Sequence, residues 1–167
     1  MSKTPKGNRL HIGLFGRRNA GKSSLLNAIT RQQVSIVSTV AGTTTDPVEK
    51  PMELLPFGPV MFIDTAGVDD AGALGAQRVG KTRKVLDRTD IGIIVSPGDW
   101  ESFEDELLAA LGERGVPVIA VLNKCDLGRP APRVLNRLAA LGLPVVLASA
   151  TRMEGIAELR QALLDVT

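Results

Sequence analysis

Cysteine, histidine and aromatic residues are scarce in this chain. Its 167 residues include one cysteine, one histidine, one tryptophan and no tyrosine. A single cysteine excludes an internal disulfide framework and is typical of a reducing compartment, so we expect a cytoplasmic protein. Cys125 and His11 have no metal-ligand spacing, so no iron–sulfur or zinc ligand set is expected in this chain. The shortage of aromatic residues leaves no visible stacking platform for RNA bases.

A strong charge imbalance and long apolar runs are also missing. The formal net charge is +2 and the charges are scattered, which favours neither nucleic acid nor a membrane surface as a partner. No segment has the apolar length of a membrane span. Residues Met1–Asn8 contain two lysines but no signal-peptide core, and we expect them to form a flexible tail. Residues 9–167 suffice for one domain that folds without disulfides.

The clearest motif is a glycine-rich segment, Gly16–Ser23, with the sequence GRRNAGKS. It lies between an apolar run and a segment with helical spacing, and so matches the GxxxxGK(S/T) phosphate loop in its required context. Its glycines let backbone N–H groups and the positive end of a helix face one anion. We expect Lys22 to reach the β- and γ-phosphates and the Ser23 hydroxyl to bind Mg²⁺. The residues expected around the phosphates are Asn19, Ala20, Gly21, Lys22, Ser23 and Ser24.

A second motif, Asn123-Lys-Cys-Asp126, indicates the base. The Asp126 carboxylate can accept hydrogen bonds from N1–H and the 2-amino group of guanine, and adenine has neither donor there. A carboxylate left unpaired against the wrong base discriminates by about 10⁴-fold or more. Asn123 would contact the base edge or tie this loop to the phosphate loop, and the stem of Lys124 would cover the base face. Ser149 and Ala150, after a short strand, are expected to add backbone contacts to guanine.

Two further segments are expected to respond to the γ-phosphate. Asp64 opens a DxxG motif that ends at Gly67; its carboxylate would hold Mg²⁺ through water, and the Gly67 amide would bond the γ-phosphate. Thr44 lies in a Thr-rich segment that either closes over the metal or is an ordinary loop. We expect Gln32–Asp46 and Thr65–Gly80 to order around GTP and loosen around GDP. The expected catalytic set is Lys22, Thr44, Asp64 and Gly67.

Strand and helix patterns alternate along the chain. This alternation predicts a three-layer α/β fold with a mostly parallel six-stranded sheet and helices on both faces, and the phosphate-loop motif makes it of the P-loop NTPase type. Leu55–Pro59 is too short for a crossover helix, so one strand is expected to be antiparallel. The expected strands are Leu10–Phe15, Val48–Leu54, Val60–Asp64, Ile91–Ser96, Val116–Asn123 and Pro144–Ala148. The expected helices are Lys22–Thr30, Ala76–Asp87, Phe103–Arg114, Ala131–Leu141 and Met153–Val166.

Together these motifs resemble the GTPases of the Era, TrmE and EngA group over nearly the whole chain. The resemblance narrows to the GTPase domain of the HydF family, which matures FeFe-hydrogenase. The run Thr43–Pro47 and the double aspartate at 69–70 separate that family from its relatives. The segments that carry the resemblance are His11–Ser24, Gly42–Val48, Asp64–Asp70 and Gly75–Lys81.

This resemblance implies a Ras-like G domain that binds GTP with Mg²⁺, hydrolyses it slowly and controls an iron–sulfur scaffold in other domains. The family's dimerisation and cluster-binding domains are absent from this sequence, so we expect one domain of a longer protein. The implied partners are guanine nucleotide, those other domains, radical-SAM maturases and hydrogenase. The alternative is an Era- or EngA-like module for RNA modification or ribosome assembly. The absence of a basic patch and the Thr43–Pro47 run favour hydrogenase maturation over that alternative.

The resemblance also bears on catalysis. Ras-like enzymes have a glutamine after the DxxG motif that orients the attacking water, whereas this chain has Val68, which cannot form a hydrogen bond. We therefore predict slow intrinsic turnover. In TrmE-like relatives an asparagine at the position of Asn19 helps hold K⁺ against the phosphates, which would stabilise charge in the transition state. Either Asn19 binds K⁺ in this way or it bonds to its own backbone.

Overall fold

A single β-sheet organises the chain. The computed structural model describes residues 10–16, 21–30, 48–54, 58–64, 85–100, 102–123, 130–149 and 154–166. Within these residues, six strands pair in the order β2-β3-β1-β4-β5-β6. Strands β3, β1, β4, β5 and β6 are parallel to their neighbours in this order. Strand β2 pairs antiparallel with β3 and lies at the edge of the sheet. The strands are β1 (Leu10–Gly16), β2 (Val48–Leu54), β3 (Gly58–Asp64), β4 (Ile91–Ser96), β5 (Val118–Leu122) and β6 (Val145–Leu147).

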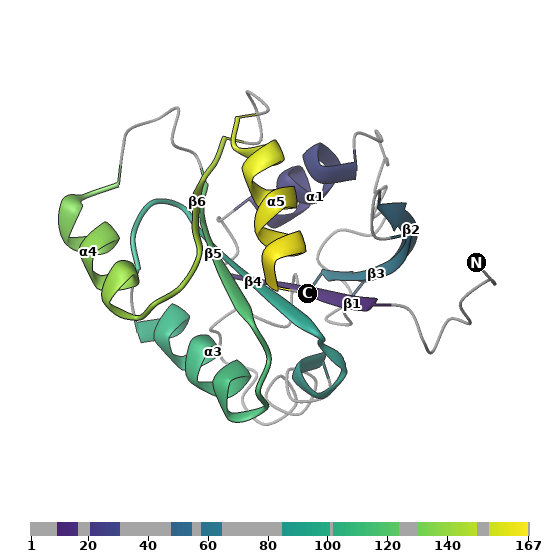
Figure 1. Ribbon diagram of the computed structural model, residues 1–167, viewed down its shortest axis with the longest axis horizontal. Coiled ribbons are helices and arrows are strands. Elements are labelled where there is room, and N and C mark those ends of the chain that lie inside the picture. Colours follow the sequence, from purple (N-terminus) through teal and green to yellow (C-terminus); the bar gives the residue numbers. More distant parts are fainter. Residues whose placement is uncertain are drawn as a thin grey trace, which may run out of the picture.

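Helices cover both faces of the sheet, which makes three layers (Figure 1). Helices α1 (Lys22–Thr30) and α5 (Ile156–Val166) pack on one face. Helices α3 (Ser102–Glu113) and α4 (Pro132–Ala140) pack on the other, together with a short helical stretch at residues 85–88. The predicted three-layer α/β architecture is therefore confirmed.

Two apolar clusters form the core, one on each face of the sheet. In β5, Ile119 and Val121 belong to the cluster under α1 and α5, whereas Ala120 and Leu122 belong to the cluster under α3 and α4. Successive side chains of a strand point to opposite faces, so a strand covered on both faces is mostly apolar. Accordingly, every residue of β4 and β5 is buried.

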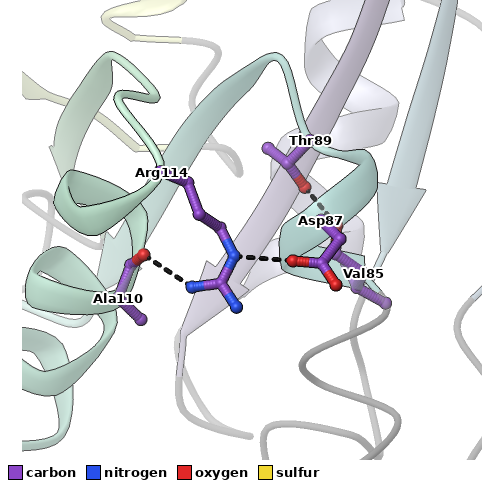
Figure 2. Close-up of polar contacts among 5 residues, drawn as sticks. All are labelled: Val85, Asp87, Thr89, Ala110 and Arg114. Carbon is purple, nitrogen blue, oxygen red and sulfur yellow. Dashed lines mark hydrogen bonds and ion pairs between the residues drawn. The ribbon is translucent and has the colours of Figure 1, made fainter.

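Arg114 ties the end of α3 to the helical stretch that precedes β4 (Figure 2). Its Nε donates to Asp87 Oδ1 at 2.8 Å and its Nη1 donates to the Ala110 carbonyl at 2.9 Å. A cation at the last turn of a helix interacts favourably with the terminal carbonyl groups. The Thr89 hydroxyl donates to the Val85 carbonyl at 2.7 Å and closes the short stretch. These contacts lie before β4 and β5 begin, so they brace the amino-terminal edge of the sheet.

The boundaries of most elements agree with the sequence predictions to within a few residues. The ranges that match their elements are Lys22–Thr30, Val48–Leu54 and Ile91–Ser96. Strand β5 is shorter than predicted at its start, because the Val116 amide donates to the Leu111 carbonyl at the end of α3, 3.1 Å away. The predicted tail 1–8 lies outside the described residues, and so does the predicted helix 76–87 before residue 85.

The predicted start of the last helix, at Met153, is wrong. Helix α5 begins at Ile156, because the Glu154 backbone pairs with Ser149 in an isolated antiparallel bridge. No helix in the described ranges is both long and apolar enough to cross a membrane. The same ranges contain no group of three or more His, Cys, Asp or Glu residues that could hold a metal ion.

Candidate functional site

The predicted site residues that the structure describes lie at the carboxyl ends of the parallel strands. Parallel pairing sets Gly16, the last residue of β1, beside Val95 of β4. The neighbouring strand β3 ends at Asp64. Beyond β4 and β5, the Asn123 amide donates to the Ser96 carbonyl at 2.7 Å, so these two strands end together. Open α/β sheets bind their ligands at this edge.

Two glycines shape the turn from β1 into α1. Gly16 has a φ of +149°, and a Cβ there would lie 2.2 Å from the Val95 carbonyl oxygen, so only glycine fits. Gly21 has a φ of +87°, and its carbonyl accepts a hydrogen bond from the Leu25 amide at 2.9 Å in the first turn of α1. No acidic residue occupies that first turn. The positive end of the α1 dipole is therefore left available to an anion at this edge.

Lys22 is buried at the start of α1. Lys22 is only 4% exposed, and its Nζ donates a hydrogen bond to the Gly16 carbonyl oxygen. A buried ammonium group is costly unless polar or charged partners compensate it. A carbonyl dipole supplies part of that compensation, and a phosphate would supply a full countercharge. The structure thus places the Lys22 ammonium group between the end of β1 and the start of α1, where the sequence predicts the phosphates to bind.

Two of the predicted magnesium ligands sit on elements that meet at this edge. Ser23 lies in the first turn of α1, and Asp64 is the last residue of β3. A hydroxyl and a carboxylate are oxygen donors of the kind that Mg²⁺ prefers, and the role of these two residues as magnesium ligands stays a prediction. Ser24, the next residue of α1, is exposed.

The predicted base-binding segments follow β5 and β6. Asn123 is 3% exposed and Ser149 is fully buried. The Ala148 amide donates to the Leu122 carbonyl at 2.9 Å. This bond joins the two segments directly, because Asn123 follows Leu122 and Ser149 follows Ala148. The structure thus places side by side two chain segments that are far apart in the sequence.

Several predicted site residues lie outside the described residues, and their roles stay predictions. These are Asn19, Ala20, Thr44, Gly67, Lys124, Asp126 and Ala150.

The sequence reasoning missed the residues that hold Ser149 in place. Ser149 and Glu154 exchange two backbone hydrogen bonds, of 3.0 and 2.9 Å. Gly155, directly after them, has a φ of +79° and packs against the end of β6. A glycine immediately ahead of a helical pattern was the one signal in the sequence that could have indicated this contact.

A search among protein families matches residues 11–124 to the model described as 50S ribosome-binding GTPase. Among curated proteins, the tRNA modification GTPase MnmE of Paraburkholderia xenovorans is 36% identical over 162 residues, covering 94% of this chain and 34% of that protein. The MnmE of Desulfotalea psychrophila is 33% identical over 158 residues, covering 92% of this chain and 33% of that protein. The chain thus spans about a third of the length of these curated relatives.

Solved structures that resemble this chain are also GTPase domains. Era in complex with MgGDPNP and nucleotides 1506–1542 of 16S ribosomal RNA superposes with a TM-score of 0.73 at 27% identity, over 93% of this chain and 56% of that one. The G domain of the T. maritima FeoB iron transporter superposes with a TM-score of 0.70 at 26% identity, over 95% of this chain and 98% of that one. The MnmE and Era matches support the RNA-related alternative better than the narrower resemblance to HydF, which the comparisons do not support.

Proposed function

Because the chain belongs to the family of 50S ribosome-binding GTPases, enzymes that hydrolyse GTP, we propose that it is the guanine-nucleotide switch domain of a longer protein. Residues 9–167 would form this domain, and its setting would be the cytoplasm, as the single cysteine suggests. The observation that carries the proposal is the buried Lys22 ammonium, bonded to the Gly16 carbonyl at the carboxyl edge of the sheet. That is where a triphosphate gains the most from fixed positive charge.

Each residue around the phosphates has a chemical role in this proposal. Lys22 neutralises charge on the β- and γ-phosphates, and the α1 amino terminus, with the backbone of Ala20 and Gly21, donates N–H groups to their oxygens. Ser23 and Asp64 would hold Mg²⁺, which supplies charge neutralisation between phosphate oxygens when bound. Thr44 and Gly67 would respond to the γ-phosphate from the two switch segments. Their loss of contact after hydrolysis would loosen those segments.

Selection of guanine rests on the two segments after β5 and β6. Asp126 would accept from N1–H and the 2-amino group, while Lys124 covers the ring. Asn123, buried beside the strand ends, would hold this loop against the phosphate loop. Backbone groups of Ser149 and Ala150 would contact the base from the other side.

We propose further that catalysis depends on a bound K⁺ near Asn19. Val68 offers no hydrogen bond to the attacking water, so the site lacks one means of lowering the barrier. A cation against the phosphates would supply charge stabilisation in the transition state, as an arginine finger does in other GTPases.

The cellular role that the relatives support is RNA modification or ribosome assembly. The MnmE proteins are named tRNA modification GTPases, and the Era structure contains 16S ribosomal RNA. Both likenesses cover more than nine tenths of this chain. The appended domains of the full-length protein would make the RNA contacts, because the chain itself has a net charge of only +2.

A second candidate role is hydrogenase maturation. The specific observation in its favour is the run Thr43–Pro47 together with the double aspartate at 69–70. In that role, the nucleotide state would control an iron–sulfur scaffold in other domains. A cluster bound by the full-length protein, and a gene beside radical-SAM maturases, would favour this role over the first.

Calorimetric titration with GTP, GDP and ATP in magnesium buffer tests nucleotide recognition. We expect saturable binding of both guanine nucleotides and none of ATP at the same concentration. Absence of heat with GTP and GDP would overturn the proposal.

A mobility-shift assay of the full-length protein with tRNA and ribosomal RNA fragments, at two salt concentrations, tests the role in RNA modification or ribosome assembly. No shift in either nucleotide state would contradict it.

A further inference from the structure

Ser149, shortly after β6, and Glu154, shortly before α5, pair with each other through their backbones. The Ser149 amide donates to the Glu154 carbonyl at 3.0 Å, and the Glu154 amide donates to the Ser149 carbonyl at 2.9 Å. Ser149 is fully buried, and Ala148 before it is also fully buried. Both ends of the segment 149–154 are therefore fixed to the core, and the position of Ser149 follows that of Glu154.

Gly155 lies so close to the end of β6 that an amino acid with a Cβ would not fit at this position. A Cβ at this position would lie 2.3 Å from the Leu147 carbonyl oxygen and 2.9 Å from the Ala148 Cα. These are backbone atoms of a strand end, which cannot yield as the tip of a flexible side chain can. The φ of +79° adds a second reason for glycine, because this backbone conformation is strained in residues with a Cβ.

The helix after Gly155, α5, is held in place by a backbone hydrogen bond and by packing in the core. The Gly155 carbonyl accepts a hydrogen bond from the Leu159 amide at 2.9 Å, which places Gly155 at the beginning of α5. Ile156 and Leu159 are buried in the core cluster shared with α1. A larger residue at 155 therefore has to displace either the amino terminus of α5 or the end of β6.

We propose that Gly155 is a positioning residue that sets the affinity for guanine. Its lack of a side chain lets α5 pack closely against the end of β6, which holds Ser149 at a fixed place beside Asn123. The hydrogen bond of 2.9 Å from the Ala148 amide to the Leu122 carbonyl fixes Ser149 relative to Asn123, because these two residues directly follow the bonded pair. The inference rests on the proposed placement of guanine between these two segments. Because the Ser149 amide already donates to the Glu154 carbonyl, the amide of the next residue, Ala150, would be the donor to an acceptor of the base, such as the 6-oxo group of guanine.

The substitution Gly155→Ala tests this role. Relieving a 2.3 Å contact requires a shift of about 1 Å, enough to break a hydrogen bond to the base. We expect GDP affinity to fall and the KM for GTP to rise by about 10- to 100-fold, the loss of one or two such bonds. The kcat at saturating GTP should stay within about twofold, because Lys22 begins α1 directly after the phosphate loop, and the strand that leads into this loop, β1, is not a neighbour of β6 in the sheet. The preference for GDP over ADP should fall by the same factor as GDP affinity.

Gly142→Ala is the matched control. Gly142 has a φ of +73°, close to that of Gly155, but no atom lies within 4 Å of a Cβ built there. It follows α4 and precedes the start of β6, whereas Gly155 packs against the residues at the end of that strand. This variant therefore carries the same backbone strain without the collision, and we expect its melting temperature to fall with the KM unchanged. If it weakened GTP binding as much as Gly155→Ala, general strain would be the cause and the inference would fail.

A second variant keeps the test decisive if Gly155→Ala does not fold. Glu154→Pro removes the amide that donates to the Ser149 carbonyl, without adding bulk against β6. We expect the same rise in KM with an unchanged kcat. Unchanged GTP affinity in a folded Gly155→Ala or Glu154→Pro protein would overturn the inference. By contrast, a wild-type protein that binds no guanine nucleotide would contradict the proposed function itself.

Discussion

The Lys22 side chain reaches back to the residue six positions earlier, where its Nζ donates a hydrogen bond to the Gly16 carbonyl oxygen. This contact links the end of β1 to the start of α1 across the phosphate loop. Because Lys22 is only 4% exposed, its ammonium group is held in place before a nucleotide arrives. A charge positioned in advance costs no reorganisation when a phosphate binds.

Replacement of Lys22 by alanine should weaken GTP binding far more than it weakens folding. A hydrogen bond to a charged group is worth about 1.5–3 kcal/mol, so we expect affinity to fall by about 10- to 100-fold. Titration calorimetry measures the affinity, and thermal unfolding without nucleotide measures the fold. Arg133→Ala is the control, since Arg133 is an exposed cation on α4. Equal affinities for the Lys22 variant and the wild type would contradict the assigned role.

The substitution Asp126→Asn should change the preferred base. An asparagine amide can donate to the 2-oxo group of xanthine, whereas it cannot accept from both N1–H and the 2-amino group of guanine. We expect GDP affinity to fall by more than about 100-fold and xanthosine diphosphate to bind more tightly than GDP. Competition between the two nucleotides provides the measurement. A variant that still prefers GDP would show that Asp126 does not contact the base edge.

Potassium should stimulate GTP hydrolysis. We expect at least a tenfold higher kcat in KCl than in NaCl at equal ionic strength, since a positioned cation stabilises charge in the transition state. Asn19→Ala should abolish the difference and leave the NaCl rate unchanged. Identical rates of the wild type in the two salts would remove the proposed role of K⁺, and Asn19 would then be a loop residue that bonds to its own backbone.

Arg160 should stabilise the end of α1. Its Nη2 donates to the Ile29 carbonyl, and α1 has no basic residue in its own last turn, so α5 supplies the cation that this helix end favours. Its Nε is buried without a hydrogen-bond partner in the described part of the chain, which offsets part of the gain. We therefore expect Arg160→Met to lower the free energy of unfolding by about 1 kcal/mol.

Urea denaturation measures this loss, and Arg133→Ala again controls for removal of a cation from a helix. The Arg133 variant should unfold at nearly the wild-type midpoint, because Arg133 is exposed. An Arg160 variant as stable as the wild type would mean that the buried Nε costs as much as the contact with Ile29 contributes.

Local sequence patterns predicted helices and strands well where a motif or a run of apolar residues specifies the element by itself. Helix α1 matches its predicted range, because a phosphate-loop motif and a regular apolar spacing both specify it. Strands β4 and β5 were recognisable from short apolar runs, because burial on both faces leaves few positions for polar residues, and Ser96 at the end of β4 is the polar residue among them. The start of α5 could not be predicted in this way. Apolar spacing extended the predicted helix back to Met153, but the Glu154 backbone pairs with Ser149 instead, and the helix begins only after Gly155.

The amino-acid sequence by itself determined which residue types are available, and from them it predicted the chemistry: a loop that suits phosphates, a carboxylate that suits guanine, and oxygen ligands that suit magnesium. These properties depend on residue types at short spacings, which are visible along the chain. Only the tertiary structure decided which segments meet, how Lys22 is held by Gly16 and why Gly155 has to be a glycine. Such contacts join parts of the chain through packing at the sheet edge, and that packing depends on the whole core rather than on any local pattern.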